Sequence, residues 1–317
     1  MKILVGTMYA GERERERCLA SVARQTLPAA EHLIIENLPK REAHERLYGT
    51  FVSRRGSFDL LIKVDADMVL CRDDLFARIA ERFAQRPAME LLSVRVHDWF
   101  TDRLMNGLNS YRNTIEWSPS GDVVFTDQFG AGNGGRGRYG RDAELAPAAW
   151  HCPDPGGFQA FHFGVHRGVK AAVAAERGLH ESAYMRWREL AWTWRHFRRV
   201  GDVRLGLAAV GGELGVSGVI GPHQLDYHDA EVREWFARFA DCGVQELVEA
   251  VSRQRRQAGA GGGGGSGPWW WRMERRRGGG WPAVLGRAAV PVPLRKAATI
   301  TARRLGGVRR VGPRTPG

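Results

Sequence analysis

The first 95 residues alternate short apolar runs with segments of helical spacing, and this alternation is the feature that most constrains the fold. The pattern predicts strands at residues 2–7, 32–36, 58–64 and 91–96 and helices at residues 12–25, 40–53 and 73–85. In the last of these helices Leu75, Ile79 and Phe83 recur every four residues, as on one face of an amphipathic helix. Such alternation is typical of an α/β fold with a mostly parallel central sheet flanked by helices.

The pattern is looser from residue 97 to residue 251. It predicts short strands at residues 123–125 and 158–165, a helix at 182–199 with an aromatic stripe that packs into a core, and a final amphipathic helix at 231–251. The glycine-rich segment 130–140 is predicted to be a loop, either a plain surface loop or a lid that closes over a bound diphosphate.

Charge separates the chain into two parts. Residues 252–317 hold 15 of the 47 Lys and Arg residues and one of the 35 acidic residues, so their net charge is +14, whereas residues 1–251 are close to neutral at −2. We therefore predict a folded domain at 1–251, with a nucleotide-binding half at 1–100 and an acceptor half at 101–251. The near-neutral domain gives no reason to expect specific nucleic-acid binding.

The segment 252–317 is rich in Gly, Arg and Trp, and Gly-rich tracts cannot repay their ordering entropy. We predict that this basic tail is mostly disordered. It is either a solvated tail without a specific partner or a peripheral contact with an anionic membrane, with Trp269–Trp271 at the headgroup level. A loose contact with RNA is a third reading.

Hydropathy and cysteine usage favour a cytoplasmic protein. No run approaches the roughly 18 uninterrupted apolar residues of a membrane-spanning helix. The four cysteines lie far apart without a C-x-x-C pair, which favours free thiols in a reducing compartment. We expect a cytoplasmic location, with the tail allowing peripheral attachment at the inner face of the membrane.

Asp65-Ala66-Asp67 directly follows the apolar run 60–64. Ligands of open α/β sheets bind outside the carboxyl ends of the strands, where these two acids are predicted to lie. Two such close carboxylates repel each other unless a positive charge lies between them, and a hard divalent cation that itself binds a diphosphate would supply it. A turn with helix-capping acids is the alternative reading of the same residues.

The sequence resembles a family-2-type glycosyltransferase with the GT-A fold. The resemblance rests on the opening strand 3–7, the helical piece 18–26, the strand 32–36 and Asp65-Ala66-Asp67, and it covers residues 1–100 best. It implies transfer of a sugar from a nucleotide-diphosphate donor to an acceptor hydroxyl, with Mn²⁺ or Mg²⁺ and inversion at the anomeric carbon. The donor would be UDP-, GDP- or dTDP-linked, and the acceptor a saccharide or glycolipid.

The resemblance also implies roles for individual residues. Asp67 would hold the metal, and Asp65 would face the ribose or sugar and contribute to the metal site. Thr7 and Tyr9 would line the nucleotide pocket. Glu36, in Glu36-Asn37-Leu38-Pro39, stands where relatives carry an acidic pair that reads the base, so the base preference stays open.

An inverting transfer needs a carboxylate that takes the proton of the acceptor hydroxyl. Asp154 is the first candidate for this base and Asp127 the second, although an Asp beside Pro is also ordinary turn chemistry. A histidine from later in the chain would complete the metal site. His162 is the first candidate, and the others are His166, His223 and His228.

Two other classes of function remain open at this stage. A haloacid-dehalogenase-type phosphatase also uses Asp-x-Asp after a strand, but that motif normally follows the first strand and continues to a Thr, whereas Met68 follows here. A non-catalytic sugar-nucleotide-binding scaffold is the other alternative.

Overall fold

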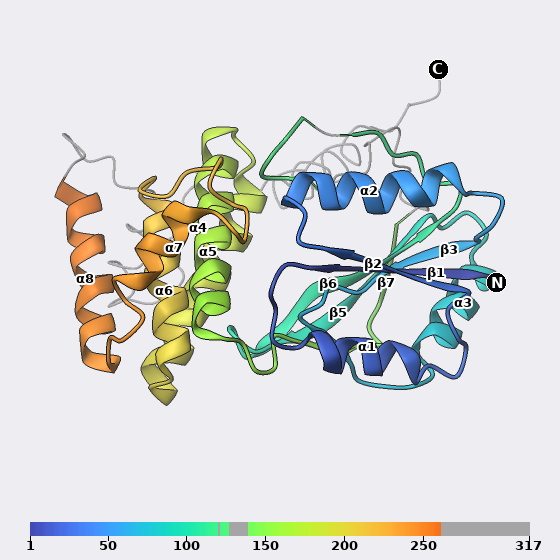
Figure 1. Ribbon diagram of the computed structural model, residues 1–317, viewed down its shortest axis with the longest axis horizontal. Helices are drawn as coiled ribbons and strands as arrows, with labels where there is room; N and C mark the ends of the chain where they lie inside the picture. The colour runs from blue at the N-terminus through green and yellow to red at the C-terminus, as the bar shows by residue number, and fades with distance from the viewer. Residues whose placement is uncertain (120, 127–138, 261–317) are drawn as a thin grey trace, which may run out of the picture.

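The computed structural model describes residues 1–119, 121–126 and 139–260 (Figure 1). The strands are β1 Ile3–Tyr9, β2 Glu31–Glu36, β3 Leu60–Lys63, β4 Met68–Leu70, β5 Leu91–Asp98, β6 Arg103–Arg112, β7 Tyr139–Asp142 and β8 Ala149–His151. The helices are α1 Arg15–Ala23, α2 Lys40–Ser53, α3 Leu75–Gln85, α4 Gly157–Glu176, α5 His180–Val200, α6 Val203–Val216, α7 Ala230–Ala237 and α8 Val244–Ala260.

The strands form one mixed sheet in the order β2-β1-β3-β6-β5-β8-β4, with β7 also paired to β5. β1 is parallel to β2 and β3, but β6 is antiparallel to both β3 and β5, and β4 is antiparallel to β8. β5 is parallel to β7 and β8, so four of the seven described strand pairs are parallel. The α/β class is therefore confirmed, and the sheet is mixed, which confirms the expectation of a mostly parallel sheet only in part. β6 follows β5 after a short turn, and strands joined in this way pair antiparallel.

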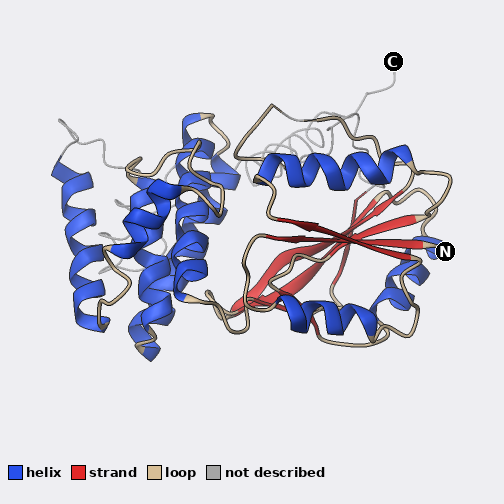
Figure 2. Cartoon of the chain, in the orientation of Figure 1, coloured by secondary structure: helices blue, strands red, loops and turns tan. Residues whose placement is uncertain are grey.

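Two helical layers cover the sheet, α2 on one face and α1 with α3 on the other (Figures 1 and 2). The period-two side-chain alternation of a strand explains how β1 serves both layers. Ile3 and Val5 belong to the core cluster that includes α1 and α3, and Leu4 belongs to the cluster under α2. β3 divides its side chains in the same manner.

The C-terminal half is a helical unit of α4–α8 beside the sheet, and the carboxyl ends of β1 and β3 point toward it (Figure 1). α4 and α6 approach so closely that a Cβ at Gly164 would lie 1.9 Å from the carbonyl oxygen of Ala208, and one at Gly211 would lie 2.3 Å from that of Phe161. Glycines at this crossing therefore allow the two backbones to touch.

Several sequence predictions for the second half are wrong. Residues 158–165 lie in α4 and do not form a strand, and residues 123–125 form irregular backbone with a bend. The predicted helix 231–251 is interrupted between α7 and α8. The predicted tail start at residue 252 lies inside α8, which continues to Ala260.

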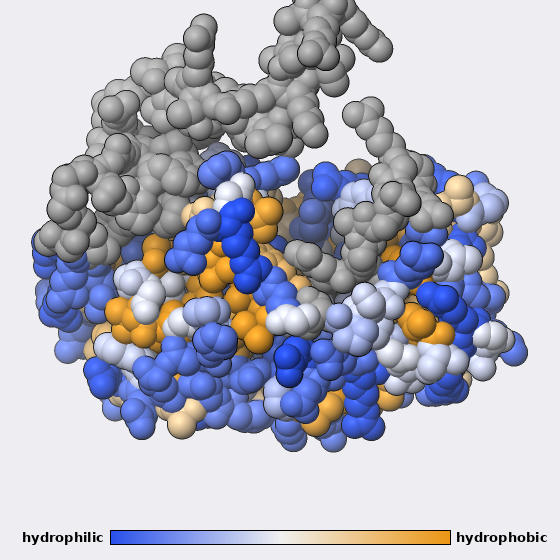
Figure 3. Space-filling view, turned by 90° about the horizontal axis from the view of Figure 1, so that it is seen from above, coloured by the Kyte–Doolittle hydropathy of each residue, from blue (hydrophilic) through white to orange (hydrophobic). Residues whose placement is uncertain are grey.

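The predicted helix at 182–199 is confirmed as α5, and its Trp187 and Phe197 are buried as expected of a packing stripe. Residues 261–317, which include most of the predicted tail, lie outside the described residues. Within the described part, no helix combines the length and the apolarity that a membrane span requires. Seen from the α2 side, hydrophobic residues are visible mainly over the helical half (Figure 3).

Candidate metal and donor site

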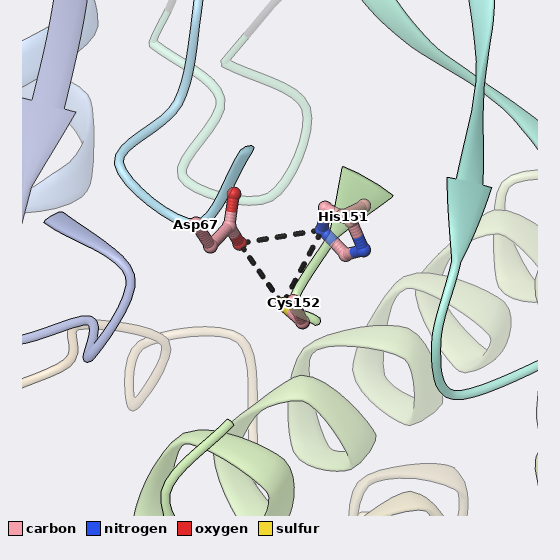
Figure 4. Close-up of side chains that lie close together, drawn as sticks. All are labelled: Asp67, His151 and Cys152. Carbon is pink, nitrogen blue, oxygen red and sulfur yellow. Dashed lines mark hydrogen bonds and ion pairs between the residues drawn. The ribbon is translucent and has the colours of Figure 1, made fainter. Parts of the chain in front are cut away.

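Asp65 and Asp67 lie where the sequence predicts, in the turn between β3 and β4 at the sheet edge that faces the helical half. The side chains of Asp65 and Asp67 interact with different partners. Lys63 Nζ donates to Asp65 Oδ2 over 2.6 Å, whereas the Asp67 carboxylate points toward His151 and Cys152 (Figure 4). The two acids therefore do not share one position, and Asp67 is the one that belongs to a cluster of ligand-type side chains.

Asp67, His151 and Cys152 bring an oxygen, a nitrogen and a sulfur together. Asp67 Oδ2 lies 3.2 Å from His151 Nε2 and accepts a hydrogen bond of 3.3 Å from Cys152 Sγ. Cys152 Sγ in turn lies 3.7 Å from His151 Nε2. These three residues are the group of potential metal ligands found among the described residues.

Strand pairing explains how residues so far apart in the sequence meet. β4 pairs antiparallel with β8, and this register places Met68 opposite His151. The backbone N–H of Cys152 then donates to the Asp67 carbonyl oxygen over 2.7 Å. Cys152 has a φ of 48°, in the left-handed region that a non-glycine residue adopts uncommonly.

A buried carboxylate fixes the orientation of the His151 ring. Asp98 is fully buried at the end of β5, and its Oδ1 lies 2.7 Å from His151 Nδ1. Its Oδ2 accepts from the backbone N–H and the hydroxyl of Thr101. With Nδ1 bound to Asp98, the Nε2 atom is the one that faces Asp67 and Cys152.

The electrostatics of the cluster follow from two carboxylates on one imidazole. Burial opposes protonation of His151, but Cys152 and the negative charges of Asp67 and Asp98 outweigh it and raise the pKa of His151 well above its ordinary value. Burial alone would raise the pKa of Asp67. The positive charge and hydrogen bond of His151 outweigh burial, and the pKa of Asp67 is lowered. Both aspartates are therefore ionised at neutral pH.

The residues present fit a divalent cation at Asp67. Its Oδ1 atom is buried and has no hydrogen-bond partner among the described residues, although a buried carboxylate oxygen is normally paired. The side chain as a whole is 21% exposed, so solvent reaches it from one side. Oδ2 of the same carboxylate lies beside the His151 and Cys152 ligand atoms, so Asp67 offers one clustered oxygen and one oxygen without a partner to a metal ion.

Sequence reasoning did not single out two further carboxylates near this cluster. Glu12 accepts from the backbone N–H groups of Ala10 and Gly11, and burial together with the charge of Asp67 raises its pKa to about 7. Glu14 is buried and accepts from Gln159 Nε2 over 2.9 Å. Both lie in the loop between β1 and α1, which contains acidic and basic residues. Only the fold brings them near Asp67, so no local sequence signal marks them.

An open pocket with a volume of about 490 Å³ lies between the loop after β1 and the helical half. It is lined by Tyr9, Ala10, Gly11, Arg13, Asn37, Gly156, Gly157, Phe158, Gln159, Tyr227, His228 and Arg233. Gln159 joins it to the metal cluster, because its Nε2 lies 3.6 Å from Cys152 Sγ.

The segment after α6 closes one side of the pocket. Asp226 Oδ1 accepts from the backbone N–H of Lys40 at the start of α2, which ties this segment to the sheet half. The next residue, Tyr227, stacks edge-on against Phe158, and Arg233 lies 4.3 Å from the Phe158 ring centroid. Gly11, at φ +126°, leaves room for Tyr227, since a Cβ there would lie 2.9 Å from its ring.

The predicted nucleotide-binding residues lie on neighbouring strands. Tyr9 ends β1 and lines the pocket, and it stands opposite Glu36 at the end of β2. Thr7 and Tyr9 both belong to β1. Thr7 is fully buried with its hydroxyl 2.9 Å from His32 Nε2, so it is not among the pocket-lining residues. Glu36 is exposed and forms an ion pair with Arg15.

Asp154, the first candidate base, follows the metal cluster by two residues. Its carboxylate lies 3.1 Å from Arg13 and 2.8 Å from Arg204, and half of its side chain is exposed. Asp127, the second candidate, lies outside the described residues, as does most of the predicted loop 130–140.

The structure places His162 away from the metal cluster. Its Nε2 bonds to the carbonyl oxygen of Leu225, and its ring contacts Tyr227 behind the pocket. Burial lowers its pKa to about 4. The histidine beside Asp67 is instead His151. No motif marks it in the sequence, because it reaches Asp67 only through the pairing of two strands of three residues each.

Comparisons with known proteins add little to this geometry. No protein-family model matches the chain, and no curated protein matches it. Among solved structures, the crystal structure of A197 from STIV is similar to part of it, with 12% identity over 41% of this chain and 78% of that chain. The TM-score of that match is 0.31, too low to carry an argument.

Proposed function

We propose that the protein transfers a sugar from a nucleotide-diphosphate donor to an acceptor hydroxyl, with a divalent metal ion at Asp67. One observation carries the proposal: a carboxylate with an unpaired buried oxygen follows a central strand, and Cys152 and Gln159 link it to an open pocket at the carboxyl edge of the sheet. Ligands of α/β sheets bind at this edge. The bound metal would neutralise the leaving nucleoside diphosphate.

The pocket has the chemistry that a nucleotide needs. Tyr9, Phe158 and Tyr227 offer aromatic faces or edges for a base. Arg13 and Arg233 place positive charge at the same pocket, which suits a diphosphate. Since Gln159 links this pocket to Cys152, a nucleotide bound there would extend its phosphates toward Asp67.

Asp65 would act through the donor and not through the metal. Its Oδ2 is held by Lys63, whose side chain is buried on β3, and this pair leaves the other carboxylate oxygen to accept from a ribose or sugar hydroxyl. Removing Asp65 would therefore weaken donor binding more than metal binding.

Asp154 is our candidate for the base that takes the acceptor proton. It is half-exposed, and Arg13, which also lines the pocket, holds its carboxylate in position. Asp154→Asn is expected to lower kcat by about 10²–10⁴-fold, the range of a lost general base, with less effect on donor KM. Glu12→Gln should be measured in parallel, since a larger kcat loss there would transfer the role to Glu12.

The experiment that tests the function is a hydrolysis and transfer panel. The full chain is incubated with UDP-, GDP- and dTDP-sugars, with metal and after chelation, and free nucleoside diphosphate is measured. Metal-dependent release from one donor class supports the proposal. No release and no donor-induced thermal stabilisation would refute it, and stabilisation without release would favour a non-catalytic scaffold.

A further inference from the structure

The donor atoms around Asp67 differ from those that a hard, oxygen-preferring cation requires. Only one of the three clustered side chains supplies oxygen, while His151 supplies an imidazole nitrogen and Cys152 a sulfur. Carboxylate, carbonyl and water ligands suit Mg²⁺ and Mn²⁺, whereas imidazole and thiolate suit zinc and similar cations. The types of ligand atom therefore indicate which metal ion the site binds.

We propose that Asp67, His151 and Cys152 form a three-ligand site for a zinc-class transition-metal cation, with a fourth position open to solvent or a donor phosphate. The role of this metal in catalysis rests on the proposed function. Metal binding itself does not, because it is measured without any sugar donor. Mn²⁺ or Mg²⁺, which the sequence resemblance implies, would then be weaker occupants of the site.

The spacing of the three ligand atoms supports a tetrahedral centre. Zinc bonds of about 2.0–2.3 Å at tetrahedral angles separate neighbouring ligand atoms by roughly 3.3–3.8 Å. The separations here are 3.2 Å from Asp67 Oδ2 to His151 Nε2, 3.3 Å from Asp67 Oδ2 to Cys152 Sγ and 3.7 Å between the last two atoms. The three atoms are already spaced as three corners of such a tetrahedron.

The surroundings of His151 have the form found around metal-bound histidines. A ligating His usually donates its other ring N–H to a carboxylate, which fixes the tautomer and the ring orientation. Asp98 provides this carboxylate at 2.7 Å from Nδ1, and Thr101 holds Asp98 in turn. Nε2 is then the ring nitrogen directed at Asp67 and Cys152, and a cation that binds there would displace its proton.

The local charge balance also favours a cation. Asp67 and Asp98 place two carboxylates on the His151 ring, and Glu12 is a third carboxylate near Asp67. A divalent cation would relieve the repulsion among these carboxylates and stabilise the thiolate, as metal ions do for coordinating thiols.

The test uses the full chain after exhaustive chelation and dialysis. Zn²⁺ binding is followed by competition with a chromophoric chelator, and Mg²⁺ binding by calorimetry. We expect one tight Zn²⁺ equivalent, with a Kd at least about 100-fold below that of Mg²⁺. Equal affinity for the two ions would overturn the proposal.

Cobalt supplies a readout that needs no variant. Co²⁺ bound by Asp67, His151 and Cys152 should show a thiolate-to-cobalt charge-transfer band in the near ultraviolet and the visible absorption of a tetrahedral centre. Co²⁺ binding without the charge-transfer band would show that Cys152 is not a ligand, and the proposal would be wrong.

Variants identify the ligands. Cys152→Ser should weaken Zn²⁺ binding by about 10–100-fold and remove the cobalt band, and Asp98→Asn should weaken Zn²⁺ binding by a similar factor but keep the band. The control is Cys71→Ser, since Cys71 is exposed and follows the end of β4 opposite to Asp67. Loss of the band in the control with retention in Cys152→Ser would refute the assignment.

The two proposals can fail separately. Tight Zn²⁺ binding with the cobalt band, but no turnover with any donor, would retain the metal site and reject the transferase. Turnover supported by Mg²⁺ in Cys152→Ser at the wild-type rate would retain the transferase and reject the thiolate ligand.

Discussion

The sheet half and the helical half each bury an acidic side chain, and they neutralise it in opposite ways. In the helical half, Glu189 is 5% exposed and lies between Arg167 at 3.2 Å and Arg186 at 3.0 Å, all on α4 and α5. In the sheet half, Asp67 meets His151 on one oxygen and leaves the other buried without a partner among the described residues. Both Glu189 oxygens accept hydrogen bonds from Arg186, whereas Asp67 keeps one buried oxygen for a ligand.

This difference indicates which buried charges serve the fold and which serve a ligand. A closed ion pair within packed helices contributes little net stability, but removing one partner leaves a buried charge unpaired. A carboxylate with an unpaired buried oxygen is destabilising for the fold alone, and such features concentrate at functional sites. We therefore expect substitutions in the two halves to separate activity from stability.

The largest expected effect is on activity in the sheet half. Asp67→Asn should lower turnover by at least about 10³-fold, because a catalytic metal contributes several kcal/mol of charge stabilisation. The helical content, followed by circular dichroism, should stay unchanged. Wild-type turnover in this variant would abolish the contrast between the halves.

The next effect is on stability in the helical half. Glu189→Gln should lower the free energy of unfolding by about 3–5 kcal/mol, since Arg167 would keep its charge in a buried position. Urea denaturation measures this change, and the folded fraction should keep its activity. Glu181→Gln, an exposed change on the same helix, is the control and should cost at most about 1 kcal/mol. Equal costs for the two variants would contradict the prediction.

The crossing of α4 and α6 provides a smaller test of packing. Gly164→Ala should cost about 2–3 kcal/mol, because the new Cβ would lie 1.9 Å from the Ala208 carbonyl oxygen and the helices would have to separate. Gly56→Ala is the matched control, as a Cβ there meets nothing within 4 Å. A thermal-denaturation midpoint shared by both variants would show that the crossing tolerates separation.

The smallest expected effect near neutral pH is the pH dependence that the helical half contributes. Burial and the nearby Lys40 and Arg233 lower the pKa of His162 to about 4, opposed by the Leu225 carbonyl and Asp226. Below its ordinary pKa of about 6.5 the unfolded chain binds a proton that the folded chain does not, so stability falls as pH drops from about 6.5 to 4. The neighbouring His166 shifts in the same direction.

We expect His162 to account for about 3 kcal/mol of this loss. Unfolding by urea at several pH values should show a shallower decline for His162→Gln than for the wild type. Parallel declines for the two proteins would mean that His162 is already protonated in the folded state.

The first part of the fold could be predicted from the sequence because its signals are local. The helices at α1, α2 and α3 and the strands at β1, β2, β3 and β5 agree with the predicted ranges to within a few residues. Each strand there is a short apolar run between helices with a single buried face, and such patterns do not depend on distant residues.

The helical half could not be predicted in the same way because its central helices are buried on several sides. The apolar run at 158–165 fits a buried strand and a buried helix equally well, and the neighbouring helices decide between them. The glycines of α6 weaken a helix by propensity, yet Gly211 is required because α4 passes directly over it. Tertiary packing overrides the local signal here.

In the candidate site, too, some features follow from local sequence and others from tertiary contacts. By itself the sequence determined that Asp65 and Asp67 follow a buried strand, since this depends on a local apolar run, whereas it ended the first strand before Tyr9, which the structure includes in β1. Only the tertiary structure decided that His151 and Cys152 face Asp67, and that His162 does not. The pairing of β4 with β8 brings together residues more than 80 positions apart, and no local pattern encodes that contact.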